Sequence, residues 1–437
     1  MSWLRDPRVA LAALTLFTLL AGDAWRNLIS WYGWGALVVL LLIGWVVVAV
    51  RHRIDLRRVP IALATFVAIV TLSIGWSAYP LSTALGVAAT VATVFVAIVM
   101  AHTVELSQLV RALGVALRWI LGLSLVFEFV VAAFIGRPVL PLWVEYDGEV
   151  PRAFYWSRAL LFEGGRIQGI PGNANLLAFA ALLGVIVFGI QLADRRIGRA
   201  AGWGWITVSV LTLVLTASAT VVLCAVGAAL AWALIMLARR MRPTRRWILY
   251  VGTTITTTAL LTAAWLLRYD LLELLGRSDD LTGRLGIWDA VEGLIRERPV
   301  FGWGWVGYWP PWEEPFTDLA IIDDVTYLQA HNAWLDVMLQ VGLVGVVVFA
   351  ILVVTTGLRA LSWSVDAPLG DFAPTPALRL FSGLLFVVLL VHSLAESRLL
   401  IEAGLLLLCF LAVTTRLRGV TVSTLTSPRE AASAESR

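Results

Sequence analysis

The sequence predicts an all-α fold, a polytopic bundle of about twelve transmembrane helices. Of its 437 residues, 60% are hydrophobic and only 14% are charged, whereas a soluble domain has about 25% charged residues. The hydrophobic residues form long runs that can cross a hydrocarbon layer of about 30 Å. No polar linker separates these runs, so we expect a single bundle over residues 1–420. The small, polar residues 421–437 are expected to form a disordered cytoplasmic tail.

The predicted spans are apolar segments of about the length that a membrane-crossing helix needs. They lie near residues 9–24, 32–50, 59–79, 81–101, 112–135, 171–192, 202–217, 219–238, 247–267, 332–358, 377–394 and 399–415. The segments at 9–24 and 202–217 are the short ones.

The distribution of arginine sets the expected orientation. All 33 basic residues are arginines, and the densest groups lie in short connections, around residues 51–58, 195–199, 239–246 and 416–418. With a cytoplasmic N-terminus, all of these groups face the cytoplasm, as the positive-inside rule requires. The net charge of +4 therefore predicts no nucleic-acid partner, because nucleic-acid binding needs basic residues that track a phosphate backbone. The expected surroundings are membrane lipids.

The same orientation places two long polar loops outside the cytoplasm, at about residues 136–170 and 268–331. Long loops in a compact bundle are usually functional. The second loop contains an amphipathic segment that ends at Arg298-Pro299, because the residue before a proline disfavours helix. One face of this segment carries Ile287, Trp288, Val291, Leu294 and Ile295. We expect a short interfacial helix with Arg284 at its start, where free backbone N–H groups and a guanidinium favour phosphate binding.

His331 lies where the second loop re-enters the membrane, and an imidazole can accept a proton near neutral pH. The alternative is a histidine that only caps a helix or lies at the interface. For Arg284, the alternative to phosphate binding is an interfacial arginine that extends its charge toward water. Glu128 lies within a predicted span, where a carboxylate favours a functional role that the sequence does not define.

The sequence predicts no metal site and no cofactor. The acidic pairs Asp279-Asp280 and Asp323-Asp324 could bind a divalent cation, but exposed carboxylates are common in loops. Cys224 and Cys409 lie inside apolar runs, which argues against a disulfide framework or a zinc site.

Short motifs follow one another in and after the second loop. They are Gly283-Arg284-x3-Trp288, Pro299-x2-Gly302-x-Gly304, His331-Asn332-x2-Leu335 and Gly342-Leu343-x-Gly345. Further pieces agree in order, namely Ser73-x2-Trp76-Ser77, Arg166-x2-Gly169 with Asn175, and Glu396-Ser397. Together, on a chain of this length and predicted topology, the motifs resemble the O-antigen ligase and polysaccharide polymerase superfamily over roughly residues 70–415.

The resemblance implies a metal-independent glycosyltransferase of a bacterial cytoplasmic membrane, with its active site on the extracytoplasmic face. Its donor would be an oligosaccharide linked to undecaprenyl diphosphate, transferred with inversion to a hydroxyl of a glycan, lipid or protein acceptor. His331 matches the family's catalytic histidine, the base for the acceptor hydroxyl, and Arg284 matches its diphosphate-binding arginine. The resemblance does not separate a polymerase from a ligase, because the two differ only in the acceptor.

The same match suggests further substrate-binding residues, which are Asn175, Gly283, Trp288 and Asn332. Another family arginine usually follows a serine at the end of a mid-chain span, but this sequence reads Ser218-Ala219. Either Arg166 or Arg277 supplies that charge, or this chain binds its lipid diphosphate in a different way. The alternative function is a transporter or flippase for a lipid-linked or anionic solute, although no internal repeat supports it.

Overall fold

The computed structural model describes residues 6–146, 148–267, 278–322, 325–366 and 374–417. Arg277, Asp323, Asp324 and the tail predicted at residues 421–437 lie outside the described residues. Helices dominate the described part of the chain, where the strands are limited to an antiparallel pair, β1 (Ile321–Ile322) and β2 (Val325–Thr326). The predicted all-α class is therefore confirmed.

The helices follow the predicted spans closely. In chain order they are α1 (Pro7–Leu20), α2 (Gly22–Arg51), α3 (Ile61–Leu72), α4 (Pro80–Thr103), α5 (Leu106–Val130), α6 (Ala174–Ala193), α7 (Arg199–Thr216), α8 (Ala219–Arg240), α9 (Arg246–Leu266), α11 (Ser278–Glu297), α12 (Ala333–Val365), α13 (Pro376–Ser393) and α14 (Glu402–Leu417). Apart from α11, each coincides with a predicted span. Within the described residues, 8 helices are long and apolar enough to cross a membrane, namely α2, α4 to α8, α12 and α13. A multi-pass membrane protein is thus confirmed, whereas the count of about twelve crossings remains a prediction.

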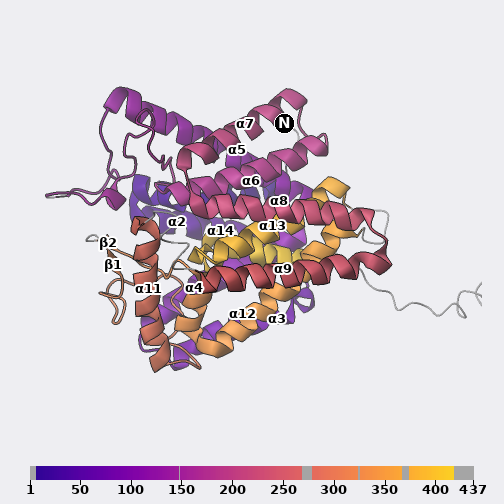
Figure 1. Cartoon of the computed structure of the whole chain (residues 1–437). Helices are drawn as coiled ribbons and strands as arrows, with labels where there is room; N and C mark the ends of the chain where they lie inside the picture. Colours follow the sequence, from indigo (N-terminus) through magenta and orange to yellow (C-terminus); the bar gives the residue numbers. More distant parts are fainter. Residues whose placement is uncertain (1–5, 147, 268–277, 323–324, 367–373, 418–437) are drawn as a thin grey trace, which may run out of the picture.

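Helix α14 lies at the centre of the bundle (Figure 1). Its residues 403–415 are all buried, because α4 and α12 pack against it and α13 also contacts it. Around this centre, α12 packs on α13 and α3, α13 packs on α8, α6 on α7, and α1 on α5. A helix that is apolar on every side can be buried in this way, with neighbours all round.

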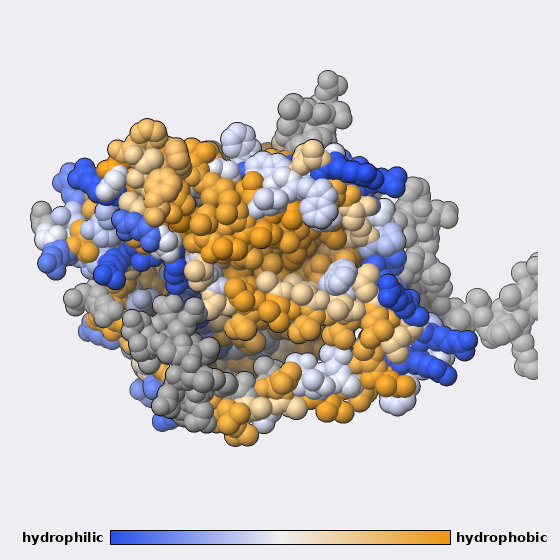
Figure 2. Space-filling model, turned by 45° about the horizontal axis from the view of Figure 1, so that its top comes forward, coloured by the Kyte–Doolittle hydropathy of each residue, from blue (hydrophilic) through white to orange (hydrophobic). Residues whose placement is uncertain are grey.

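The outer surface carries an apolar belt. Figure 2 shows hydrophobic residues across the middle of the visible face, with hydrophilic residues toward both ends. Large apolar side chains of the outer helices are exposed, among them Leu40 of α2, Val214 of α7 and Leu230 of α8. Apolar area on this scale is unfavourable in water and suits a hydrocarbon environment.

The two long connections lie at the same end of the bundle, on the left of Figure 1. One joins α5 to α6, and the other contains α11 and the β1–β2 pair. The arginine-rich turn between α8 and α9 lies at the opposite end. This separation agrees with the orientation expected from the arginines, although which end faces the cytoplasm remains a prediction.

Helix α11 is the amphipathic helix that the sequence predicts in the second loop. Its inner face is buried, with Ile287 only 2% exposed and Val291 fully covered. This face packs on a small apolar cluster that includes Trp309 and Phe316 from the following segment. The helix ends at Glu297, just before Arg298-Pro299, as predicted.

The start of α11 differs from the prediction. The helix begins at Ser278, so Arg284 lies in its second turn, about 9 Å along the helix axis from the first residue. The expectation that Arg284 lies beside the free N–H groups of a helix start is therefore wrong. The run Ser278-Asp279-Asp280 explains the earlier start, because Ser and Asp are favoured in the cap and first turn of a helix.

Candidate active site

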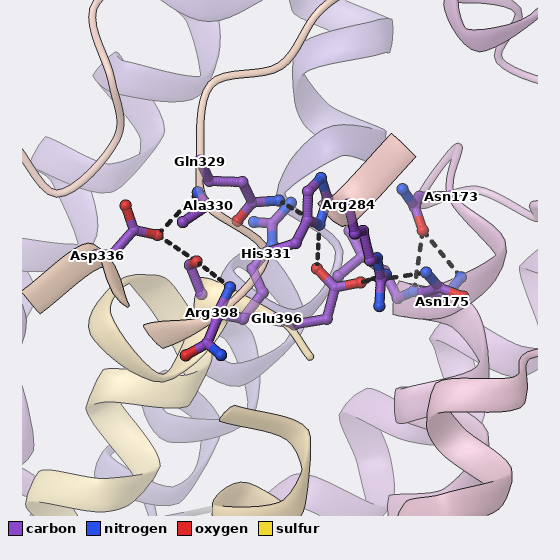
Figure 3. Close-up of polar contacts among 12 residues, drawn as sticks. Asn173, Asn175, Arg284, Gln329, Ala330, His331, Asp336, Glu396 and Arg398 are labelled. Atoms are coloured by element: carbon purple, nitrogen blue, oxygen red, sulfur yellow. Dashed lines mark hydrogen bonds and ion pairs between the residues drawn. The ribbon is translucent and has the colours of Figure 1, made fainter. Parts of the chain in front are cut away.

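The carboxylate of Glu396 lies where several distant parts of the chain meet (Figure 3). Glu396 belongs to the connection between α13 and α14 and is only 4% exposed. Its Oε1 accepts hydrogen bonds from Nη2 of Arg284 at 2.9 Å and from Nδ2 of Asn175 at 3.2 Å. Its Oε2 lies 3.0 Å from Nδ1 of His331. The structure therefore brings together three of the predicted site residues around one carboxylate.

Glu396 is ionised in this setting. Burial opposes its charge, but the neighbouring His331, the hydrogen bond from that imidazole and the charge of Arg284 outweigh the burial. Together they hold the pKa of the Glu396 carboxyl well below its usual range. A buried carboxylate is stable only with such partners. The sequence contains Glu396 in a motif but indicates no role for it, so its central place is a finding of the structure.

The contact with Glu396 fixes the tautomer of His331. An ionised carboxylate only accepts hydrogen bonds, so Nδ1 of the imidazole must carry the proton that faces Oε2. In the neutral imidazole, Nε2 then presents a lone pair, as a general base requires. The side chain of His331 is 15% exposed, which leaves it accessible to a bound molecule.

Two predicted substrate-binding residues hold the backbone around His331. The indole of Trp288 donates to the carbonyl oxygen of Ala330 at 2.9 Å. The side chain of Asn332 accepts from two backbone N–H groups in the first turn of α12, so it caps that helix. His331 itself has a φ of 49°, in the left-handed region. These contacts show structural roles for Trp288 and Asn332, while substrate binding by either residue remains a prediction.

Arg166 joins the site through Asn175. Nη2 of Arg166 donates to Oδ1 of Asn175 at 2.9 Å, and Nε donates to the carbonyl oxygen of Thr216 at 3.1 Å. The hydroxyl of Ser218 donates to the same Asn175 oxygen at 2.8 Å. Asn175 therefore connects the guanidinium of Arg166 to the carboxylate of Glu396.

The position of Arg166 is relevant to the arginine that the family usually has after the serine, where this chain has Ala219. Helix α7 ends at Thr216, Ala217 adopts a left-handed φ of 45°, and Ser218 caps α8 by accepting from Val221 N. Arg166 thus places its guanidinium at the α7–α8 break, beside the Ser218-Ala219 pair that lacks the arginine. Of the two candidates from the sequence, Arg277 lies outside the described residues. Gly283, the residue before Arg284, belongs to α11.

Glu128 positions the segment that carries Arg166. Its side chain on α5 is buried, and its carboxylate accepts from the backbone N–H groups of Gln168 at 2.9 Å and Gly169 at 2.6 Å. It also accepts from the hydroxyl of Ser157 at 2.8 Å. Gly169 has a φ of 57°, a conformation that glycine adopts without strain. The intramembrane carboxylate noted in the sequence therefore holds the first long connection in place.

A second charged network adjoins the short connection that carries Glu396. Asp23 pairs with Arg26, Arg26 with Glu402, Glu402 with Arg398, and Arg398 with Asp23, so the four side chains form a closed ring. The ring joins the start of α2 to the start of α14. Because Arg398 follows Glu396 by two residues, the ring fixes the short connection that carries Glu396.

The arrangement joins an imidazole, which can act as a base, to a guanidinium, which can bind an anion, through one shared carboxylate. Where side chains are described, no group of three or more His, Cys, Asp or Glu residues is placed to hold a metal ion. The cationic groups that face the cluster, Arg284 and Arg166, can bind phosphate by paired N–H donors.

Comparison with known proteins agrees with the motif order. Residues 204–350 match the family model described as O-antigen ligase. The matched stretch runs from α7 into α12 and contains Arg284 and His331, whereas Arg166, Asn175 and Glu396 lie outside it. No curated protein sequence matches the chain. The resemblance to the O-antigen ligase-like superfamily is confirmed.

Proposed function

We propose that this O-antigen ligase-like membrane protein is a glycosyltransferase whose active site is the cluster around Glu396. It moves a glycan from an undecaprenyl-diphosphate-linked donor to an acceptor hydroxyl, with inversion at the anomeric carbon. The proposal rests on one observation. The buried carboxylate of Glu396 contacts His331 through one oxygen and Arg284 through the other. This contact brings the imidazole of His331 and the guanidinium of Arg284 to the same carboxylate, which supports roles for them as proton acceptor and phosphate-binding cation.

His331 acts as the base. With Nδ1 held by Glu396, Nε2 takes the proton of the acceptor hydroxyl as its oxygen attacks the anomeric carbon. The imidazolium that forms is stabilised by the ionised Glu396, as in other carboxylate–histidine pairs. Attack on the face opposite the diphosphate inverts the anomeric configuration.

Arg284 and Arg166 act on the leaving group. Negative charge develops on the diphosphate as the glycosidic bond breaks, and guanidinium groups placed beforehand stabilise that charge. The planar fork of arginine suits phosphate oxygens and requires no metal ion. Arg284 is 18% exposed at its side chain, so it can contact a bound phosphate while Glu396 orients it.

The place of the cluster favours an enzyme over a transporter or flippase. Asn175 lies in the first turn of α6, His331 lies two residues before α12, and Glu396 lies between α13 and α14. These positions are helix ends, on the side where both long connections gather (Figure 1). Transporter sites instead lie near the middle of the membrane, often at broken helices. We assign this end to the extracytoplasmic face of a bacterial cytoplasmic membrane, with a glycan, lipid or protein as acceptor, in a polymerase or a ligase.

The test is complementation of a deletion strain with His331→Ala and, as a matched control, His52→Ala. His52 is exposed and follows α2, far in sequence from the cluster. General-base assistance is worth about 10²–10⁴-fold, so His331→Ala should nearly abolish the polymer or ligated glycan. His52→Ala should complement fully, with both proteins at equal level in the membrane. Normal product from His331→Ala would show that His331 is not the base.

A further inference from the structure

Asp336 is a buried carboxylate that the proposed reaction leaves without a role. It lies in the first turn of α12 and is fully buried. Its Oδ1 accepts from the indole Nε1 of Trp309 at 2.8 Å. Its Oδ2 accepts from the backbone N–H of Ala330 at 3.1 Å and from the hydroxyl of Ser397. A buried charge is costly, so its retention in an apolar bundle points to a specific task.

The hydroxyl of Ser397 completes the arrangement. It donates to Asp336 and accepts from the backbone N–H of Asn332 at 3.2 Å. Ala330 and Asn332 are the two neighbours of His331, and both therefore donate their backbone N–H groups to the Asp336–Ser397 pair. Ser397 is also the residue after Glu396 in the connection between α13 and α14. One pair of side chains thus holds both partners of the His331–Glu396 contact.

The backbone of His331 needs such support. A φ of 49° at a residue other than glycine is sparsely populated and energetically unfavourable. It persists only where surrounding contacts impose it. The hydrogen bonds of the two flanking N–H groups impose it here, and a change of φ would rotate the imidazole away from Oε2 of Glu396.

We propose that Asp336 and Ser397 are a positioning pair for the transfer reaction. They hold His331 in its left-handed conformation and keep its imidazole on Glu396, without contact to donor or acceptor. The proposal rests on the proposed function, in which His331 is the base. A displacement of about 1 Å at a reacting group can cost about 10²-fold in rate, so loss of the pair should lower turnover rather than donor binding.

Asp336→Asn is the first test variant. The carboxylate receives three donors, and an asparagine has one oxygen and two N–H groups of its own. In either orientation its amide nitrogen faces a donor. Ser397→Ala is the second variant, because it removes both hydroxyl contacts and leaves a small apolar residue that the site can accommodate. Trp309→Phe is the matched control, since it removes the Oδ1 donor and leaves the Oδ2 contacts to the His331 segment intact.

Turnover is measured in membranes that contain each variant, with radiolabelled lipid-linked glycan extracted from the deletion strain. We expect Asp336→Asn and Ser397→Ala to lower turnover by about 10- to 100-fold, with the donor KM unchanged. Trp309→Phe should keep wild-type turnover per inserted protein. In single-turnover measurements on a His331→Ala background, Asp336→Asn should have no further effect, because it acts through the imidazole.

The outcomes separate this proposal from the proposed function. Wild-type turnover in both Asp336→Asn and Ser397→Ala would overturn the positioning pair. An equal loss in Trp309→Phe would overturn it as well, because the effect would then be one of local stability. A further loss when Asp336→Asn is added to His331→Ala would show that Asp336 acts elsewhere. Normal transfer by His331→Ala alone would instead refute the proposed function.

Discussion

Glu396→Gln tests what the buried carboxylate does for His331. The amide oxygen of the glutamine can accept from Arg284 and Asn175, as Oε1 of Glu396 does. Its amide nitrogen then faces Nδ1 of His331, where Oε2 now lies at 3.0 Å. Two donors cannot share this contact, so Nδ1 must give up its proton and Nε2 must carry it. An imidazole protonated on Nε2 cannot take a proton from the acceptor.

The size of the effect follows from this change of tautomer. In a comparable carboxylate–histidine pair, loss of the correct tautomer costs about 10⁴-fold in turnover, and we expect a loss of about that order here. The effect on stability should be smaller. Removing one partner of a buried ion pair costs about 3–5 kcal/mol, whereas glutamine has nearly the shape of glutamate and still accepts from Arg284. The variant should therefore insert into the membrane and remain folded.

Glu402→Gln is the matched control for this experiment. Glu402 is also a largely buried glutamate paired with two arginines, but it belongs to the neighbouring ring and does not contact His331. The assay is transfer of lipid-linked glycan from the deletion strain, normalised to the amount of folded protein in the membrane. We expect Glu402→Gln to lower thermal stability and to reduce turnover far less than Glu396→Gln, because Arg398 still pairs with Asp23 and the contact of Glu396 with His331 is unchanged. Wild-type turnover in Glu396→Gln, or an equal loss in both variants, would refute the tautomer argument.

The remaining predictions concern the donor site, the first long connection and the topology. Arg284→Lys keeps the charge but loses the planar fork, so the donor KM should rise several-fold, whereas Arg296→Lys on the exposed face of the same helix should behave as wild type in the same assay. Glu128→Gln retains an acceptor for the two backbone N–H groups. Glu128→Leu leaves both without a partner, and each unsatisfied N–H lowers the free energy of unfolding by about 1–3 kcal/mol. We therefore expect a clear loss of thermal stability and of turnover in the leucine variant alone. Cysteines introduced at the exposed positions Glu149 and Asp318 should react with a membrane-impermeant reagent in intact cells. Labelling of both only after permeabilisation would place the site on the cytoplasmic face.

The helices could be predicted from hydropathy, because a hydrocarbon environment allows few backbone structures. A chain in hydrocarbon must satisfy its backbone hydrogen bonds internally, so each long apolar run becomes a helix. The arrangement of the helices was not predictable in this way. The burial of α14, for example, depends on neighbours that are distant in sequence, and its apolar run resembles those of the outer helices.

In the candidate site, too, some residues could be predicted from the sequence and others could not. Arg284 and His331 were found because each belongs to a short local motif. Glu396 was not assigned a role, because its importance arises from contacts with Asn175, Arg284 and His331, which lie between 65 and 221 residues away in sequence. One local signal was available and not used. Asn332 directly precedes an apolar run, which is the typical place of a helix cap.

The closed ring of Asp23, Arg26, Arg398 and Glu402 has a consequence for biosynthesis. Asp23 and Arg26 are synthesised long before Arg398 and Glu402, because the ion pairs between them join residues 375 and 376 positions apart in sequence. Until α14 arrives, Asp23 and Arg26 lack half of their partners within the ring, and an incompletely paired charge in a bundle is unfavourable. Closure of the ring therefore marks the arrival of α14 beside the start of α2. A nascent chain that stops before Arg398 leaves the ring open, with Asp23 and Arg26 paired only to each other within it.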